Sequence, residues 1–325
     1  MGDTAPRIGL VLGAGGVAGG AFHAGVLAAL EAATGWDPRA ASMIVGTSAG
    51  SIAGASLRAG LSAADQLARA HDRPLSPEGR RVVQRVGPIR RPPSLRPART
   101  ARPPAELAAT LARAARRPFA ARPWSLLAAL LPEGSLSTEM ISEGIGGLFP
   151  TTWPDEPLWV CAVRQGDGRR VVFGRDGLCP PIPEAVAASC AIPGFFSPVV
   201  INGEAYIDGG VHSPTNADTM FHAAPLDLVI VSSPMSLQGR RPRFAVDQPM
   251  RGWSRALLDA EVFGLRRRRI PVLAFQPDAD VLAAMGANAM DPIRRGAIAE
   301  AAGQSAQRTL ARRDVTERLE VVGLS

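Results

Sequence analysis

Short apolar runs alternate along the chain with stretches in which apolar residues recur at helical spacing. Runs rich in Val, Ile and Leu predict buried strands at residues 7–12, 41–45, 158–163, 228–231 and 270–275. After the first run, residues 21–31 place Phe22, Val26 and Leu30 on one side and predict a helix. Strands that alternate with helices favour a mostly parallel sheet covered on both faces. We therefore predict an α/β fold of three layers, with helices on either side of one sheet.

Turn and cap residues add further elements to this prediction. One hairpin is expected around the turn 165–168, which joins the run 158–163 to a strand at 170–173, and a second around Asn202-Gly203. Ser62 has the residue type of a helix N-cap. Helices are predicted at residues 51–60, 62–71, 136–148, 183–189, 257–269 and, as a pair, 291–312.

The stretch Gly46-Thr47-Ser48-Ala49-Gly50 stands between a predicted strand and a predicted helix. Gly-x-Ser-x-Gly at such a junction is the pattern of a nucleophile elbow, a turn sharp enough to lift a serine hydroxyl clear of the sheet. Side chains two residues either side of the serine would collide with neighbouring backbone, and Gly46 and Gly50 remove that collision. The hydroxyl then lies at a helix N-terminus, which favours negative charge. Ser48 is the candidate nucleophile, and a Gly/Ser turn without chemistry is the alternative.

A glycine-rich loop, Gly13 to Gly20, follows the first predicted strand. Several backbone N–H groups can converge in such a loop without Cβ obstruction, which makes a site for negative charge. One interpretation is an oxyanion hole. Another is a dinucleotide fingerprint, because Gly13-x-Gly15-x-x-Ala18 fits that pattern. The fingerprint expects an acidic residue closing the second strand, and neither Glu31 nor Asp37 is well placed for it. The third interpretation is that the loop is only a tight turn.

A serine nucleophile needs a base. Asp208 ends an apolar strand and is followed by Gly209 and Gly210, so its carboxylate has free backbone N–H groups beside it. A carboxylate within hydrogen-bond reach of the serine can take its proton directly. A β-turn without chemistry is the alternative for Asp-Gly-Gly. A Ser-Asp-His triad stays open by chain order, because His212 and His222 follow Asp208, although neither histidine has a supporting motif.

Positive charge is concentrated in one part of the chain. Between Arg73 and Arg122, 13 arginines stand against two glutamates, so this segment carries +11 and the rest of the chain about −4 of the net +7. Arg-Pro pairs are frequent in the first half of the segment and predict irregular chain there, and helices are predicted at 106–117 and 123–131. We predict a single domain spanning residues 1–325, in which 73–135 form an Arg/Pro-rich helical cap insertion.

Two interpretations of this insertion remain open. Basic residues beside an apolar helix that starts with Trp124 are typical of a segment that contacts an anionic membrane surface. The alternative is a cap packed on the protein's own core, with a solvated arginine face. The arginine-rich part has one internal aromatic, Phe119, and no recognisable nucleic-acid-binding module, so nucleic acid is not an expected partner.

Three widely spaced cysteines, Cys161, Cys179 and Cys190, show no metal-ligand spacing, and we expect neither a metal nor a cofactor. Their odd number favours a reducing compartment. The first residues lack a basic region followed by an apolar core and a cleavage site, so no signal peptide is expected. The uncharged stretch 8–30 contains seven glycines and is interpreted as strand, loop and helix rather than as a membrane span. We expect a cytoplasmic protein, peripheral to the membrane if the insertion binds lipid.

Four motifs in a fixed order resemble the patatin-like phospholipase family. They are the glycine loop Gly13 to Gly20, the elbow Gly46 to Gly50, the segment Ala188-Ser189-x-Ala191-x-Pro193-x-x-Phe196-x-Pro198, and Asp208 to Gly210. Each motif is weak alone, but the ordered set is specific. The resemblance covers most of residues 7–235 and leaves the Arg-rich insertion uncovered. One departure is that the family's usual Gly-Gly-Gly-x-Arg-Gly has Ala18 in place of its arginine.

The resemblance implies a patatin-like fold and a Ser-Asp dyad without histidine, with Ser48 as nucleophile and Asp208 as general base. It also implies an oxyanion hole formed by the backbone of Gly15, Gly16 and Val17. The expected activity is hydrolysis of a lipid or fatty-acyl ester through an acyl-enzyme. Two other functions are weighed against it: a lipid-binding or regulatory protein with little activity, and a nucleotide-dependent oxidoreductase that uses the glycine loop.

Overall fold

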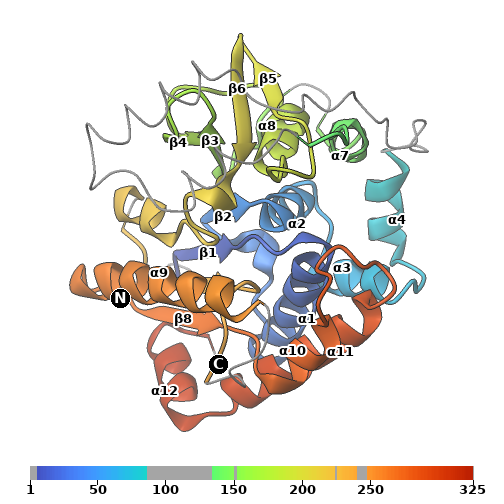
Figure 1. Cartoon of the computed structure of the whole chain (residues 1–325). Coiled ribbons are helices and arrows are strands. Elements are labelled where there is room, and N and C mark those ends of the chain that lie inside the picture. The colour runs from blue at the N-terminus through green and yellow to red at the C-terminus, as the bar shows by residue number, and fades with distance from the viewer. Residues whose placement is uncertain (1–5, 86–133, 150–151, 224, 240–246, 325) are drawn as a thin grey trace.

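The computed structural model describes residues 6–85, 134–149, 152–223, 225–239 and 247–324. These residues form one mixed sheet with the strand order β5-β6-β3-β2-β1-β7-β8, and β4 pairs with β3 away from this path. In the view of Figure 1, the β5–β6 hairpin lies at the top, and helices surround the sheet below it. The predicted α/β fold with helices on both faces of a mostly parallel sheet is confirmed.

The centre of the sheet is parallel and buried. It consists of β1 (Ile8–Leu12), β2 (Met43–Thr47), β3 (Leu158–Arg164), β7 (Leu228–Ser232) and β8 (Val272–Phe275). Their runs of Val, Ile and Leu suit strands that are covered on both faces. All five match predicted strands, although β2 begins and ends two residues later than expected. That shift brings Thr47 into the sheet directly before Ser48.

The antiparallel part of the sheet determines where Asp208 lies. It contains β4 (Arg170–Phe173), β5 (Val199–Ile201) and β6 (Glu204–Asp208), which confirm both predicted hairpins. Thr47 of β2 pairs with Cys161 of β3, and the next residue of β3, Ala162, pairs with Asp208 of β6. Strands β2 and β6 flank β3, so this register places the end of the elbow strand and Asp208 at the same level of the sheet.

Two layers of helices cover the sheet. One face carries α1 (Gly16–Thr34), α2 (Ala49–Arg58), α3 (Ala63–Ala70), α10 (Ala279–Met285) and α11 (Arg295–Leu310). The other face carries α9 (Gln248–Arg267) and the short 3-10 helix η3 (Ala217–His222). Alternate strand residues divide between two cores: Leu10 and Ile44 belong to the first, and Val11 and Val45 to the second. The remaining α-helices of the described residues are α7 (Glu139–Gly146), α8 (Ile182–Ser189), α12 (Arg313–Val321) and α4, whose position is given below.

Several helix boundaries differ from the predictions. Helix α1 begins at Gly16, not at residue 21, and its glycine-rich first turns lie close to other segments: a Cβ on Gly19 would lie 3.3 Å from Pro234 Cγ and 3.5 Å from Ala49 Cβ. Helix α9 begins at Gln248, nine residues before its predicted start. The prediction of two helices within 291–312 is wrong: one helix, α11, occupies most of that range, and the second, α12, begins after it. Helix α10, capped by Asp278, was not predicted.

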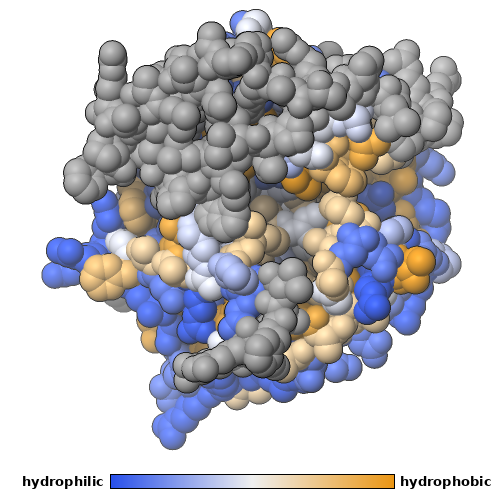
Figure 2. Space-filling view, viewed as in Figure 1, coloured by the Kyte–Doolittle hydropathy of each residue, from blue (hydrophilic) through white to orange (hydrophobic). Residues whose placement is uncertain are grey.

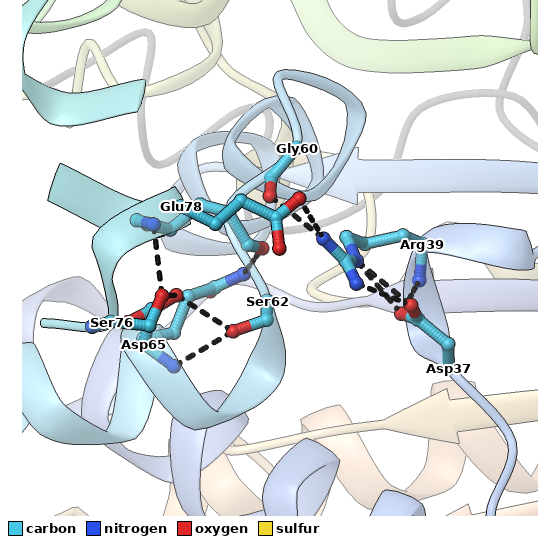
Figure 3. Close-up of polar contacts among 10 residues, drawn as sticks. Asp37, Arg39, Gly60, Ser62, Asp65, Ser76 and Glu78 are labelled. Carbon is cyan, nitrogen blue, oxygen red and sulfur yellow. Dashed lines mark hydrogen bonds and ion pairs between the residues drawn. The ribbon is translucent and has the colours of Figure 1, made fainter. Parts of the chain in front are cut away.

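The start of the predicted 73–135 insertion is anchored to the body of the protein. Residues Pro77–Gln84 form helix α4, where the sequence indicated irregular chain. Figure 3 shows the buried Asp65 carboxylate accepting hydrogen bonds from the Ser62 hydroxyl and from the Ser76 backbone and hydroxyl, at 2.7–2.9 Å. Beside it, Arg39 bridges Asp37 and Glu78. The predicted helices 106–117 and 123–131 lie outside the described residues.

Within the described residues, one helix, α1, is long and apolar enough to cross a membrane. Most of it is buried inside the protein, where it packs against α11, α3 and α2. It therefore has the environment of a core helix, and the interpretation of stretch 8–30 as strand, loop and helix is confirmed, with a loop of only three residues. On the face of the molecule that Figure 2 shows, hydrophilic residues cover much of the lower half, where Figure 1 places α11 and α12.

Candidate active site

The turn between β2 and α2 has the geometry of a nucleophile elbow. Ser48 has φ 53° and ψ −122°, a conformation that L residues with a Cβ adopt only under strain. A Cβ on Gly46 would lie 2.5 Å from the Cα of Ser51, and one on Gly50 would lie 1.9 Å from the carbonyl oxygen of Leu12. Both glycines are therefore required by contacts with backbone, as the sequence predicts, and Ser48 stands at the N-terminus of α2.

The backbone of Ser48 is held by a second serine. The Ser48 N–H donates to Ser189 Oγ at 2.9 Å, and Ser189 Oγ in turn donates to the Cys161 carbonyl oxygen at 2.6 Å. Sequence reasoning included Ser189 in a family-like segment but gave it no role. Its position at the end of α8, packed on β3, lets one hydroxyl join the elbow to the neighbouring strand.

The structure brings Ser48 and Asp208 together. Both residues line one cavity, and the Gly210 N–H donates to Asp208 Oδ1 at 2.7 Å. Both are almost fully buried, with 3% of Ser48 and 5% of Asp208 exposed. Burial raises the pKa of Asp208 to about 6, although the nearby Ser48 hydroxyl and the Gly210 N–H oppose this shift. A carboxyl group with such a pKa is ionised at neutral pH and is still basic enough to accept a proton.

The glycine loop faces Ser48 and Asp208. Its residues Gly15 and Gly16 line one cavity together with Ser48, Asp208 and Gly210. Among the described residues, the N–H groups of Gly15, Gly16 and Val17 have no hydrogen-bond partner. Two neighbouring N–H groups are occupied: Ala14 donates to the Pro214 carbonyl and Ala18 to the Ala289 carbonyl. The N–H groups of Gly15, Gly16 and Val17 are those that the family resemblance assigns to an oxyanion hole. Gly15 and Gly16 line the cavity at Ser48, whereas Val17 lines a different cavity, beside Ala49 and Ile52.

A buried histidine supports this loop. His23 Nε2 lies 2.8 Å from the Gly13 carbonyl oxygen, which can only accept, so this nitrogen carries the proton, and Nδ1 accepts from the Ser232 hydroxyl. Burial lowers the pKa of His23 to about 4, so the ring is neutral at physiological pH. His23 is thus a structural residue that fixes Gly13 against the end of β7. His212 lies in the turn after Asp208, outside the set of described residues that line the cavity.

The cavity at Ser48 has a volume of about 320 Å³ and a largely apolar wall. Apart from the residues already named, the side chains that line it come from distant parts of the chain: Ile192, Pro193, Val211, Pro214, Met235, Met250, Trp253, Ala289 and Met290. Methionines fill irregular apolar space and adapt to flexible ligands. Ile192 and Pro193 fall in the family-like segment 188–198, but no local pattern marks the other positions, and none was predicted to line a cavity. A hydroxyl, a carboxylate and free N–H groups at the rim of an apolar cavity suit an ester with a hydrocarbon tail.

A protein-family profile for patatin-like phospholipase matches residues 10–221, which is more than half of the chain. The chain belongs to the patatin-like phospholipase family. The match covers the glycine loop, the elbow and Asp208, and it supports lipid hydrolysis as the general activity. Among solved structures, VipD from Legionella pneumophila is similar, with 12% sequence identity and a TM-score of 0.42, over 94% of this chain and 67% of that chain. No curated protein sequence gives a match.

Ala18, the departure from the family's glycine motif, lies in the first turn of α1. A small cavity of about 90 Å³ separates it from Arg251 of α9. The Arg251 guanidinium donates to the carbonyl oxygens of Pro234 and Ser236 and pairs with Asp247. The patatin-like glycine loop is therefore packed against a segment that an arginine from another helix holds in place.

Proposed function

We propose that the protein is a serine lipid acyl hydrolase of the phospholipase A, lysophospholipase or esterase type, acting through a Ser48–Asp208 dyad. The observation that carries the proposal is that these two residues meet in one apolar cavity, where the Ser48 hydroxyl favours the charged form of the Asp208 carboxylate. The free N–H groups of Gly15, Gly16 and Val17 support it, because a developing oxyanion needs fixed donors.

In this mechanism, Asp208 accepts the proton of the Ser48 hydroxyl as the serine oxygen attacks the ester carbonyl carbon. The loop N–H groups bind the oxyanion of the tetrahedral intermediate, and each donor contributes about 3–4 kcal/mol. The intermediate collapses to an acyl-enzyme while Asp208 returns the proton to the leaving alcohol. Water, deprotonated by Asp208, then attacks the acyl carbon and releases the fatty acid. A panel of phospholipids, lysophospholipids and neutral glycerides tests which lipid class is cleaved.

A lipid-binding or regulatory protein with little activity is the main rival. It predicts no covalent reaction at Ser48, whereas a hydrolase reacts with a fluorophosphonate probe at that residue. The nucleotide-dependent oxidoreductase is disfavoured by two features. The segment Ala289–Met290 covers the start of α1, where a Cβ on Gly16 would lie 2.8 Å from Met290 Sδ. Strand β2 ends in the neutral Thr47, where the fingerprint expects an acid. A thermal shift with NAD(P) tests this function directly.

The pKa of the proposed base predicts the pH profile. Asp208 accepts a proton only when it is ionised, so kcat/KM should fall as pH drops through about 6 and reach a plateau above pH 7. Stopped assays with a short p-nitrophenyl ester between pH 4.5 and 8 measure this limb. The variant His212→Ala should keep it. A limb that disappears in His212→Ala would assign the base to the histidine and replace the dyad by a triad.

We also propose that the Arg-rich segment 73–122 brings the enzyme to anionic membrane surfaces from the cytoplasm. Binding of the full chain to vesicles containing phosphatidylserine should weaken with salt, because screening shortens the reach of these charges. Replacing Arg113, Arg116 and Arg117 by Gln should weaken binding roughly 100-fold, at about 1 kcal/mol per arginine near the surface. The matched control replaces three other arginines by Gln: Arg312, which precedes α12, and Arg313 and Arg318 within it. Equal losses in both triple variants would show a general charge effect and contradict a role for this segment.

A further inference from the structure

A buried carboxylate lies on α9, outside the residues that react. Glu261 is 5% exposed, and it accepts hydrogen bonds from the Ser213 and Thr215 hydroxyls, both at 2.6 Å, and from the Ala217 N–H at 3.0 Å. These three donors belong to one turn, residues 213–217, which follows the Asp-Gly-Gly motif. Burial raises the pKa of Glu261, and the hydrogen bonds oppose the shift. A side chain from a distant helix thus fixes the shape of this turn.

The turn 213–217 contacts all three segments of the candidate active site. The Pro214 carbonyl accepts from Ala14 N–H of the glycine loop at 2.7 Å. Asn216 Nδ2 donates to the Ser213 carbonyl within the turn at 2.6 Å. It also donates to Thr47 Oγ1, next to Ser48, at 3.1 Å, and to the Gly209 carbonyl, next to Asp208, at 3.4 Å. Each contact outside the turn is made one residue from a group of the proposed mechanism. None of the contacting side chains, those of Glu261, Asn216 and Thr47, lines the cavity at Ser48.

Asn216 suits this position for two reasons. Its backbone is left-handed, with φ 51° and ψ 32°, a conformation that asparagine tolerates better than most residues. Its amide orientation is set by Arg170, whose Nη1 donates to Asn216 Oδ1 at 3.1 Å, so the NH₂ group must face Thr47 and Gly209. Arg170 is itself held by an ion pair with Asp218. The amide is therefore oriented before any substrate arrives.

We propose that Glu261 and Asn216 are positioning residues, which set the relative placement of the Ser48 hydroxyl, the Asp208 carboxylate and the oxyanion loop through the turn 213–217. This inference rests on the proposed hydrolase function. A displacement of about 1 Å in such a constellation costs roughly 100-fold in rate, even when the mutated residue is remote from the reacting atoms. A buried charge is by itself a poor means of stabilising a fold, which favours a role for Glu261 in geometry.

The test uses Asn216→Gly, which keeps the left-handed backbone and removes the amide, and Glu261→Ala with its conservative counterpart Glu261→Gln. We expect Asn216→Gly and Glu261→Ala to lower kcat about 10- to 100-fold with KM changed less than about twofold, since neither mutated side chain lines the cavity. Glu261→Gln should recover most of the loss, because its amide oxygen still accepts. The matched control is Ser305→Ala, which removes another hydroxyl–carboxylate hydrogen bond, from the buried Ser305 to the partly exposed Asp278; neither residue lines the cavity. It should lower Tm without changing kcat.

Hydrogen–deuterium exchange provides a readout that does not depend on activity. In Asn216→Gly, exchange should rise together in peptides covering 13–20, 43–52 and 204–212, and in Ser305→Ala it should not. Folded Asn216→Gly and Glu261→Ala enzymes with unchanged kcat and unchanged exchange in these peptides would overturn the inference. A wild-type chain without Ser48-dependent hydrolysis would overturn the proposed function, and the exchange experiment would still decide whether the turn holds the three segments.

Discussion

Ser48→Ala should reduce kcat for short p-nitrophenyl esters by about 10⁴- to 10⁶-fold, the scale on which loss of a serine nucleophile acts. The reason is that, among the described residues that line the cavity, Ser48 alone carries a hydroxyl able to form the acyl-enzyme. The neighbouring Ser51 hydroxyl donates to the Ser48 carbonyl oxygen, and Ser189 is engaged with the elbow backbone and Cys161. Alanine also fits the turn as serine does, because both carry one Cβ at the same positive φ. We therefore expect an unchanged circular dichroism spectrum and a Tm close to wild type.

The control for this variant is Ser56→Ala, on the same helix and also buried, where the hydroxyl donates to the Ile52 carbonyl inside α2. It should retain full activity and full fluorophosphonate labelling, while Ser48→Ala should lose both. Wild-type rates in a folded Ser48→Ala protein would end the hydrolase proposal. Labelling of wild type without turnover of any ester or lipid would favour the lipid-binding alternative.

The elbow and the acidic motif could be predicted from the sequence because their causes are local. Gly46 is required by a contact with Ser51 in the same strand–turn–helix unit, and Gly50 by the carbonyl of Leu12 on the adjacent strand β1. A five-residue pattern records both glycines. The proximity of Ser48 and Asp208 also has a simple origin, since Ser48 directly follows β2, Asp208 is the last residue of β6, and both strands flank β3. Chain order and strand signals were therefore enough to suggest the pair, although the register that aligns them came from the structure.

The remaining parts of the site are made by contacts that no local pattern records. Glu261 is 45 residues or more from the hydroxyls that it binds, and the lining of the cavity comes from α9 and from loops near residues 192, 235 and 290. Ser189 joins two segments that are also far apart in sequence. A single Glu in a basic helix, or a Met in a loop, is indistinguishable by sequence from a surface residue. The start of α1 was also missed, because glycine propensity argued against a helix there.

Asp208→Asn should lower kcat about 10²- to 10⁴-fold, the contribution of a general base, while KM changes little. The asparagine keeps an acceptor for the Gly210 N–H and a polar contact for Ser48, so the geometry survives and the ability to take a proton is lost. His212→Ala serves as the matched comparison and should remain within a few-fold of wild type. Losses of similar size in Asp208→Asn and His212→Ala would require a triad.

The same variant should be more stable than wild type at neutral pH. The pKa of Asp208 is about 6 in the folded chain and has the ordinary value of 3.8 in the unfolded chain. The contribution of this carboxyl to the free energy of unfolding is therefore most favourable below pH 4 and is lost as pH rises through 6. At pH 7.5 the folded wild type carries the whole cost of a buried charge, and asparagine removes it. Tm of Asp208→Asn should therefore exceed that of wild type at pH 7.5 by more than at pH 4.5. A Tm gap that is equal at both pH values, or reversed, would show that the carboxylate is not strained by burial, and it would remove the reason for expecting a base with a pKa near 6.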